Sequence, residues 1–84
     1  MIYNLIFDPK AEIQLRKFDG HVRERILSAL DRIKTRPFSY DLKKLQGTKY
    51  YRLRVGEYRI IIDVQQDKLI IVVIEIGHRK NIYD

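Results

Sequence analysis

Residues 50 to 59 read YYRLRVGEYR and lead into the apolar run IIIDVQQDKLIIVVIEI at residues 60 to 76. Runs of β-branched and aromatic residues separated by short polar segments are typical of strands joined by turns. Gly56-Glu57 fits a two-residue type II′ turn, which has glycine at its first central position. The sequence therefore predicts three consecutive strands, at about residues 50–55, 58–65 and 69–76.

The predicted turn sets the pairing of the first hairpin, with Val55 opposite Tyr58 and Arg54 opposite Arg59. Alternate residues of a strand face opposite sides of a sheet. The apolar face, expected to pack against helices, comprises Leu53, Val55, Tyr58, Ile60, Ile62 and Val64. The other face carries Tyr50, Arg52, Arg54 and Arg59. Because like charges directly opposite one another destabilise a sheet, the second face is expected to hold an anion.

The second hairpin is expected to have a three-residue loop, Gln66-Asp67-Lys68. That loop would place Glu75 opposite Arg59, as one carboxylate among three guanidinium groups. The last strand is apolar on both of its faces, which favours a central position in the sheet.

The first half of the chain predicts one strand and two helices. Residues 2–7 are β-prone, and Asp8-Pro9 is a helix start with an N-cap and proline in the first turn. Gly20 separates this helix from a second one at about residues 21–36. Residues 43–47 are predicted to be a loop. The expected fold is α+β: one domain over residues 1–84, with a helical hairpin packed on one face of a mostly antiparallel four-stranded sheet, in the order β-α-α-β-β-β.

The composition favours a polyanionic partner, nucleic acid above all. The net charge is +6 and the pI is about 9.7, and Lys43, Lys44 and Lys49 are candidate RNA-binding residues. The chain has no cysteine and two distant histidines, His21 and His78, so no metal site or cofactor is expected. No signal peptide or membrane-length apolar run is visible, so a cytoplasmic protein is expected.

Arginines on one sheet face would suit RNA cleavage, because a guanidinium grips phosphate oxygens and stabilises the charge of a phosphorane. The substrate's own 2′-OH can serve as nucleophile, and no metal is then required. A base must take the proton of the 2′-OH, and an acid must protonate the leaving 5′-oxygen. Tyr83, His78 and Glu75 are the candidates for proton transfer, and nearby arginines would lower the pKa of Tyr83.

Four segments of the chain resemble the RelE-type toxins of the RelE/ParE superfamily, and the resemblance covers essentially the whole sequence. They are Asp8–Ala11, Lys44–Gly47, Tyr51–Arg59 and Gly77–Tyr83. The resemblance implies a ribosome-dependent mRNA endoribonuclease that cuts in the A site by attack of the 2′-OH. It also implies a cognate antitoxin that binds and blocks the toxin, with promoter DNA bound only through that antitoxin.

The same resemblance implies roles for individual residues. Arg59 matches the arginine that stabilises the scissile phosphate, and Arg79 matches a second arginine that acts on the transition state or leaving group. Tyr83 matches the tyrosine proposed as general base, while His78 stays open as an alternative base or acid. Arg52 and Arg54 stand where well-studied members carry lysines. Arginine keeps the charge there but does not readily release a proton.

Two other functions remain open from the sequence. A ParE-like toxin has the same fold but inhibits DNA gyrase and cleaves no RNA. A non-catalytic module would bind nucleic acid or an antitoxin without cutting. The combination of Arg59, Arg79 and Tyr83 favours the nuclease.

Overall fold

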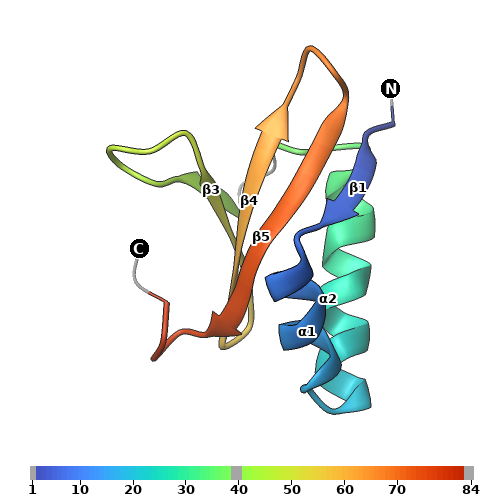
Figure 1. Ribbon diagram of the computed structural model, residues 1–84, viewed down its shortest axis with the longest axis vertical. Helices are drawn as coiled ribbons and strands as arrows, with labels where there is room; N and C mark the ends of the chain where they lie inside the picture. The colour runs from blue at the N-terminus through green and yellow to red at the C-terminus, as the bar shows by residue number, and fades with distance from the viewer. Residues whose placement is uncertain (1, 39–40, 83–84) are drawn as a thin grey trace.

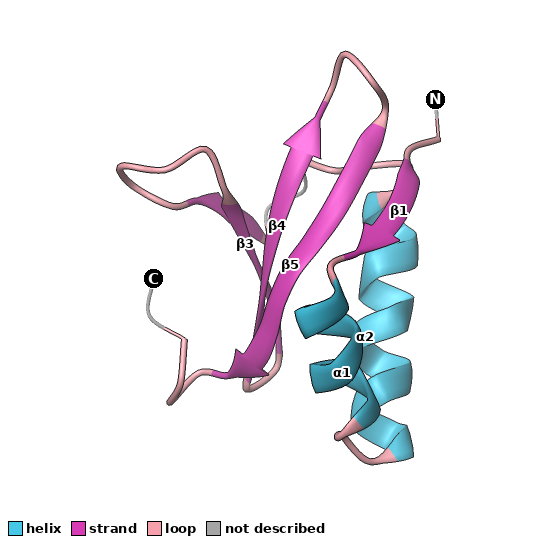
Figure 2. Ribbon diagram, viewed as in Figure 1, coloured by secondary structure: helices cyan, strands magenta, loops and turns pink. Residues whose placement is uncertain are grey.

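The computed structural model, which describes residues 2–38 and 41–82, is an α+β fold in which two helices cover one face of a sheet (Figures 1 and 2). The elements follow one another as β1 (Asn4–Phe7), α1 (Pro9–Arg16), α2 (Gly20–Ile33), β2 (Leu42–Lys44), β3 (Tyr51–Val55), β4 (Tyr58–Gln65) and β5 (Ile70–His78). The α+β class and the helical hairpin on one face are therefore as the sequence predicts.

The sheet has five strands rather than the four predicted, in the order β1-β5-β4-β3-β2. The additional strand is β2, which pairs antiparallel with β3. Its last two residues, Lys43 and Lys44, fall in the segment that the sequence predicts to be a loop. The strand is only three residues long and carries two lysines, a composition typical of short edge strands. β1 pairs parallel with β5, so β5 has a neighbour on each side, as its apolar composition predicts.

Both helices begin at an aspartate that caps them. The Asp8 side chain accepts a hydrogen bond from the Lys10 N–H at 3.0 Å, and Asp19 accepts one from the Val22 N–H at 3.1 Å. The sequence predicts that the second helix starts at about residue 21 and ends at about residue 36. It starts at Gly20 because Asp19 caps it, and it ends at Ile33, where Thr35 bonds back to the Arg32 carbonyl.

The core lies between α2 and the helix-facing side of the sheet. Its fully buried side chains are Ile26, Leu30, Ile33, Leu53, Ile60, Ile62, Ile71, Val73 and Ile76. Tyr58 and Val64 pack against this core, so the predicted apolar face is confirmed. Within the described residues, no helix is long and apolar enough to span a membrane.

Truncation of the core from α2 should be costly. Leu30 is fully buried, and Leu30→Ala is expected to lower the free energy of unfolding by about 2–5 kcal/mol through lost burial and the cavity left behind. The matched control is Leu27→Ala in the same helix, where the side chain is 41% exposed and a much smaller loss is expected. Urea unfolding of both variants checks this, and equal losses would contradict the assigned core face.

The first hairpin has the predicted register, with Val55 paired to Tyr58 and Arg54 paired to Arg59. Gly56 has a φ of +57°, as the first central position of the predicted turn requires.

The second hairpin differs from its prediction by two residues. Gln65 pairs with Ile70, so the loop has one residue more than expected, and a bulge between Ile61 and Ile62 adds a second shift. Arg59 therefore pairs with Gly77, and Glu75 pairs with Ile61. The prediction that Glu75 stands opposite Arg59 is wrong.

Candidate active site

Three arginines project from β3 and β4 onto the face of the sheet that the helices leave open. Arg54 pairs with Arg59 across the hairpin, and Arg52 lies between Lys43 on β2 and Ile61 on β4. Residues that pair directly across two strands point to the same face. The "arginine face" is defined here as Arg52, Arg54 and Arg59.

Arg52 is the most enclosed member of the arginine face, with 9% of its surface exposed. Burial lowers the pKa of Arg52, and the neighbouring charges of Arg59 and Arg54 lower it further. A guanidinium still stays protonated at neutral pH. The lowered pKa therefore means that the charged form of Arg52 is disfavoured by its surroundings, and a bound phosphate would relieve this.

The Arg59 guanidinium folds back over its own turn. Its Nη1 donates hydrogen bonds to the Gly56 carbonyl at 3.0 Å and to the Tyr58 carbonyl at 3.1 Å. These bonds fix the position of the guanidinium through one nitrogen. Its other two nitrogens are thereby oriented, and they could grip phosphate oxygens from a defined position.

Arg79 is held at the same end of the sheet by Glu57. The Arg79 Nε lies 2.5 Å from a carboxylate oxygen of Glu57, and the Arg79 N–H donates to the Glu57 carbonyl at 2.8 Å. Both side chains are exposed. The carboxylate among these arginines is thus Glu57 from the turn, which sequence reasoning missed. Glu75 instead lies 3.4 Å from the ammonium group of Lys10.

His78 lies on the helix-covered face. It pairs with Tyr58, and the two rings meet edge to face with centroids 5.5 Å apart. Tyr58 packs in the same way on Phe18, at 5.1 Å. The His78 Nδ1 accepts the Lys80 N–H at 3.2 Å. The structure therefore does not bring the His78 ring together with the arginine face.

The chain after β5 returns to the arginine face through Ile82. Gly77 pairs with Arg59, so a Cβ at Gly77 would point to the same face as Arg59. Such an atom would lie 2.9 Å from the Cδ1 of Ile82, which is 8% exposed. Ile82 thus occupies space beside Arg59 that any side chain at Gly77 would need. Tyr83, the next residue, lies outside the described residues.

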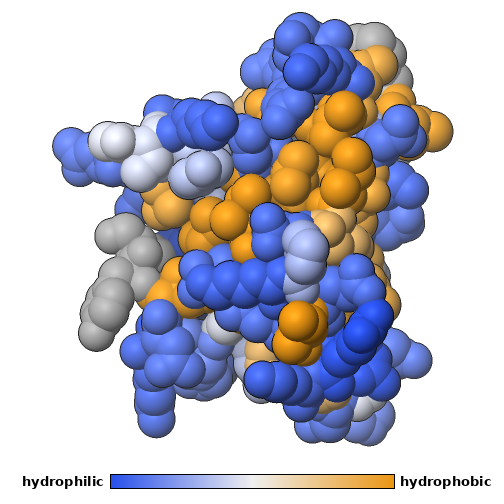
Figure 3. All heavy atoms as spheres, viewed as in Figure 1, coloured by the Kyte–Doolittle hydropathy of each residue, from blue (hydrophilic) through white to orange (hydrophobic). Residues whose placement is uncertain are grey.

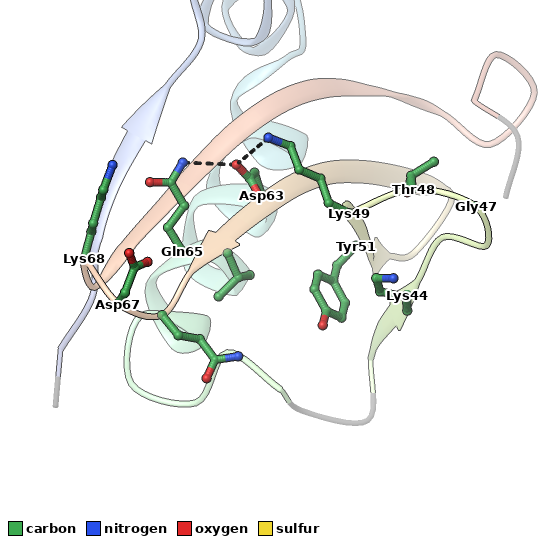
Figure 4. Close-up of a pocket in the computed structure, with 11 residues that line it drawn as sticks. Lys44, Gly47, Thr48, Lys49, Tyr51, Asp63, Gln65, Asp67 and Lys68 are labelled. Atoms are coloured by element: carbon green, nitrogen blue, oxygen red, sulfur yellow. Dashed lines mark hydrogen bonds and ion pairs between the residues drawn. The ribbon is translucent and has the colours of Figure 1, made fainter.

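The three candidate lysines are divided between two surfaces. Lys43 pairs with Arg52 and extends the arginine face. Lys44 and Lys49 instead line an open hollow of about 930 Å³ between the β2–β3 loop and the β4–β5 hairpin (Figure 4). The Lys49 Nζ lies 3.8 Å from the buried Asp63, whose carboxylate also accepts from the Gln65 amide at 3.1 Å (Figure 4).

Within residues 2–38 and 41–82, no group of His, Asp or Glu side chains has an arrangement that could hold a metal ion. What the site offers is fixed positive charge on one side of the sheet. Such charge suits the binding of phosphates and the stabilisation of a negatively charged transition state.

Comparison with known proteins identifies the family. A family model described as the ParE toxin of the type II toxin–antitoxin system parDE matches residues 5–83. The chain belongs to the RelE/ParE superfamily of type II toxins. Several relatives to which this chain is similar carry RelE names. Toxin RelE3 of Methanocaldococcus jannaschii is 39% identical over 75 residues, covering 83% of each chain. The mRNA interferase toxin RelE of Escherichia coli is 31% identical, covering 95% of this chain and 86% of the relative.

Solved structures of the superfamily share the fold. The toxin in the intact E. coli RelBE toxin–antitoxin complex aligns with a TM-score of 0.79 at 32% identity, covering 90% of this chain and 95% of that one. Residues 5–83, which the family model matches, include both strands that carry the arginine face. The RelE-type reading of the sequence is thereby confirmed at the level of family and fold.

Proposed function

We propose that this protein is a toxin that cleaves mRNA in the ribosomal A site, in the cytoplasm, without a metal ion. The observation that carries the proposal is the arginine face, with Arg59 fixed on its turn and Arg79 held beside it by Glu57. Guanidinium groups gathered on one face of a sheet suit the phosphodiester backbone of RNA, because each can grip phosphate oxygens bidentately. The mRNA interferase name of the E. coli relative supports the same reaction class.

The proposed reaction is an in-line transfer within the RNA. The 2′-oxygen forms a bond to phosphorus, the bond to the 5′-oxygen breaks, and the products are a 2′,3′-cyclic phosphate and a 5′-hydroxyl end. Tyr83 takes the proton of the 2′-OH. Arg59 and Arg52 stabilise the charge on the non-bridging oxygens. Arg79 donates a hydrogen bond to the leaving 5′-oxygen, which receives its proton from water, because a guanidinium does not release one readily.

A cognate antitoxin is the proposed protein partner. Several solved relatives are complexes of RelE with RelB, including those from E. coli and M. jannaschii. An antitoxin that covers the arginine face would block access of RNA to it. Binding to promoter DNA is assigned to the antitoxin within that complex.

Gyrase inhibition is the second candidate function, favoured by the ParE description of the matching family model. RNA cleavage requires the arginine face to bind a phosphate, whereas gyrase inhibition does not. A gyrase inhibitor acts on a protein surface and needs no phosphate grip.

Two assays with the purified protein separate the candidates. The nuclease proposal predicts that cell-free translation stops and that DNA supercoiling by gyrase continues at the same protein concentration. Inhibition of supercoiling with translation intact would replace the nuclease by the ParE-like function. A salt-dependent affinity for RNA with neither inhibition would indicate a non-catalytic binding module.

A substitution at Gly77 tests whether the C-terminal segment must lie beside Arg59. Gly77→Ala would place a methyl group 2.9 Å from the Cδ1 of Ile82, so the Ile82 side chain must shift beside Arg59. We expect cleavage to slow by about 10-fold or more, because small misplacements of a reacting group are costly. The melting temperature should change little, since the displaced atoms are the end of a flexible side chain.

The matched control is Gly20→Ala, where nothing lies within 4 Å of the added methyl group and α2 has already begun. Cleavage by this variant should equal that of the parent. Full cleavage by Gly77→Ala would show that the position of Ile82 does not matter to the reaction.

A further inference from the structure

A second group of arginines surrounds a hollow on the other side of the β3–β4 turn. The hollow has a volume of about 470 Å³ and lies between α2 and β3. It is lined by Arg25, Arg32 and Arg54 together with His21, Ser28 and Glu24. Three arginines from two separate elements, α2 and β3, thus line the hollow beside one carboxylate residue, Glu24.

Gly56 connects this hollow to the arginine face. A Cβ at Gly56 would lie 2.6 Å from the Nη2 of Arg25, so the absence of a side chain lets that guanidinium sit directly against the turn. The carbonyl of the same glycine accepts the Nη1 of Arg59 at 3.0 Å. The guanidinium groups of Arg25 and Arg59 therefore contact one residue from different elements.

The positive charges around this turn are only partly compensated. Arg32 lies 3.4 Å from the carboxylate of Asp41, and Arg79 pairs with Glu57. Among the described residues, neither Arg25 nor Arg54 has a carboxylate within ion-pair distance. Close like charges raise the energy of a fold unless an anion binds between them. Guanidinium groups held in fixed positions match phosphate oxygens better than lysines would.

We propose that the hollow of Arg25, Arg32 and Arg54 is a second phosphate site, which takes a backbone phosphate of the RNA strand whose scissile phosphate lies on the arginine face. The strand would pass over the end of the β3–β4 turn, where Arg54 belongs to both surfaces and Gly56 contacts both Arg25 and Arg59. An RNA strand is favoured over an acidic peptide because the two surfaces are continuous and phosphates repeat along the chain. The assignment of the bound strand as the RNA substrate rests on the proposed function. The assignment of the hollow as a phosphate site does not.

The test uses a fluorescein-labelled, single-stranded dodecamer of 2′-O-methyl RNA, which cannot be cleaved because its nucleophile is blocked. Anisotropy titrations at several salt concentrations compare Arg25→Gln with Arg36→Gln. Arg36 is an exposed arginine outside the hollow, so its substitution changes the net charge equally. We expect Arg25→Gln to weaken binding by about 3- to 10-fold and to reduce the salt slope by about 0.7, the value for one lost phosphate contact on a single strand. Arg36→Gln should change neither.

Equal titrations for the two variants would overturn the site. Arg25→Lys controls for an effect of the substitution on folding. It keeps the positive charge, and we expect it to bind the RNA with an affinity between those of the parent and Arg25→Gln. A labelled RNA hairpin stem is the second arm: tighter binding of the stem, with the same loss in Arg25→Gln, would assign the site to folded RNA such as that of the ribosome. A twelve-residue glutamate peptide that binds as tightly as the RNA would overturn the assignment to nucleic acid.

The cleavage assay separates this proposal from the proposed function. If both hold, Arg25→Gln raises the substrate concentration needed for half-maximal cleavage and leaves the maximal rate unchanged. If the parent protein cleaves nothing but the two variants still differ in RNA affinity, the phosphate site stands and the nuclease function falls.

Discussion

Arg59→Ala is expected to slow ribosome-dependent mRNA cleavage by about 10²–10³-fold, the usual effect of removing one preorganised donor from a charged transition state. Arg59 is fixed by its bonds to the Gly56 and Tyr58 carbonyls, so it needs no reorganisation when charge develops on the phosphate. The melting temperature should stay the same or rise, because the change removes one of two arginines that face each other across the hairpin.

The matched control for this experiment is Arg36→Ala, which removes an equal charge from an exposed position outside the arginine face. It should cleave at the rate of the parent. Marked unfolding of Arg59→Ala would contradict the placement of Arg59 on the open face, and unchanged cleavage by a folded variant would remove Arg59 from the reaction.

Tyr83→Phe is expected to slow cleavage by about 10²–10⁴-fold, the range for a lost general base. Ile82, the residue before Tyr83 in the sequence, packs on Gly77 beside Arg59. The phenylalanine variant keeps the ring and loses only the hydroxyl. The rate of the parent should therefore rise with pH as the base loses its proton, and the variant should lack this rise.

Tyr51→Phe provides the control, since it removes a hydroxyl from a half-buried tyrosine that pairs with Ile62 and whose ring packs on Phe38, away from the arginine face. That variant should keep both the rate and the pH profile. If Tyr83→Phe cleaves at the parental rate with the parental pH profile, the base is not Tyr83. His78 would then be the remaining histidine candidate near the end of β5, although its ring lies with Tyr58 on the helix-covered face.

The parts of the fold set by local rules could be predicted from the sequence. A glycine in a two-residue turn determines a register, so the pairing of Arg54 with Arg59 follows from Gly56-Glu57 alone. The register of the second hairpin could not be predicted in this way. The register shift between Ile61 and Ile62 cannot be read from the alternation of an all-apolar segment, and so the sequence alone predicts the wrong partner for Glu75.

In the candidate site, too, placements that follow from local rules could be predicted, and contacts between distant elements could not. The shared face of Arg52, Arg54 and Arg59 follows from strand alternation, which the sequence carries. The pairing of Arg79 with Glu57 joins a tail to a turn, and no periodicity reports such a contact. The separation of Lys43 from Lys44 and Lys49 depends on β2, a strand too short to show a pattern. The contact between Arg25 and Gly56 joins two elements that lie far apart in the sequence, so no local pattern predicts it.

The central claim is that this protein cuts mRNA on the ribosome with its arginine face. Its most direct test is the cleavage of an end-labelled mRNA, with and without 70S ribosomes stalled on it, by the parent protein and by Arg59→Ala. The account predicts cuts that appear only with ribosomes, fall inside the A-site codon and are lost in the variant. The absence of cuts by a folded parent protein in both settings, or equal cutting by Arg59→Ala, would contradict it.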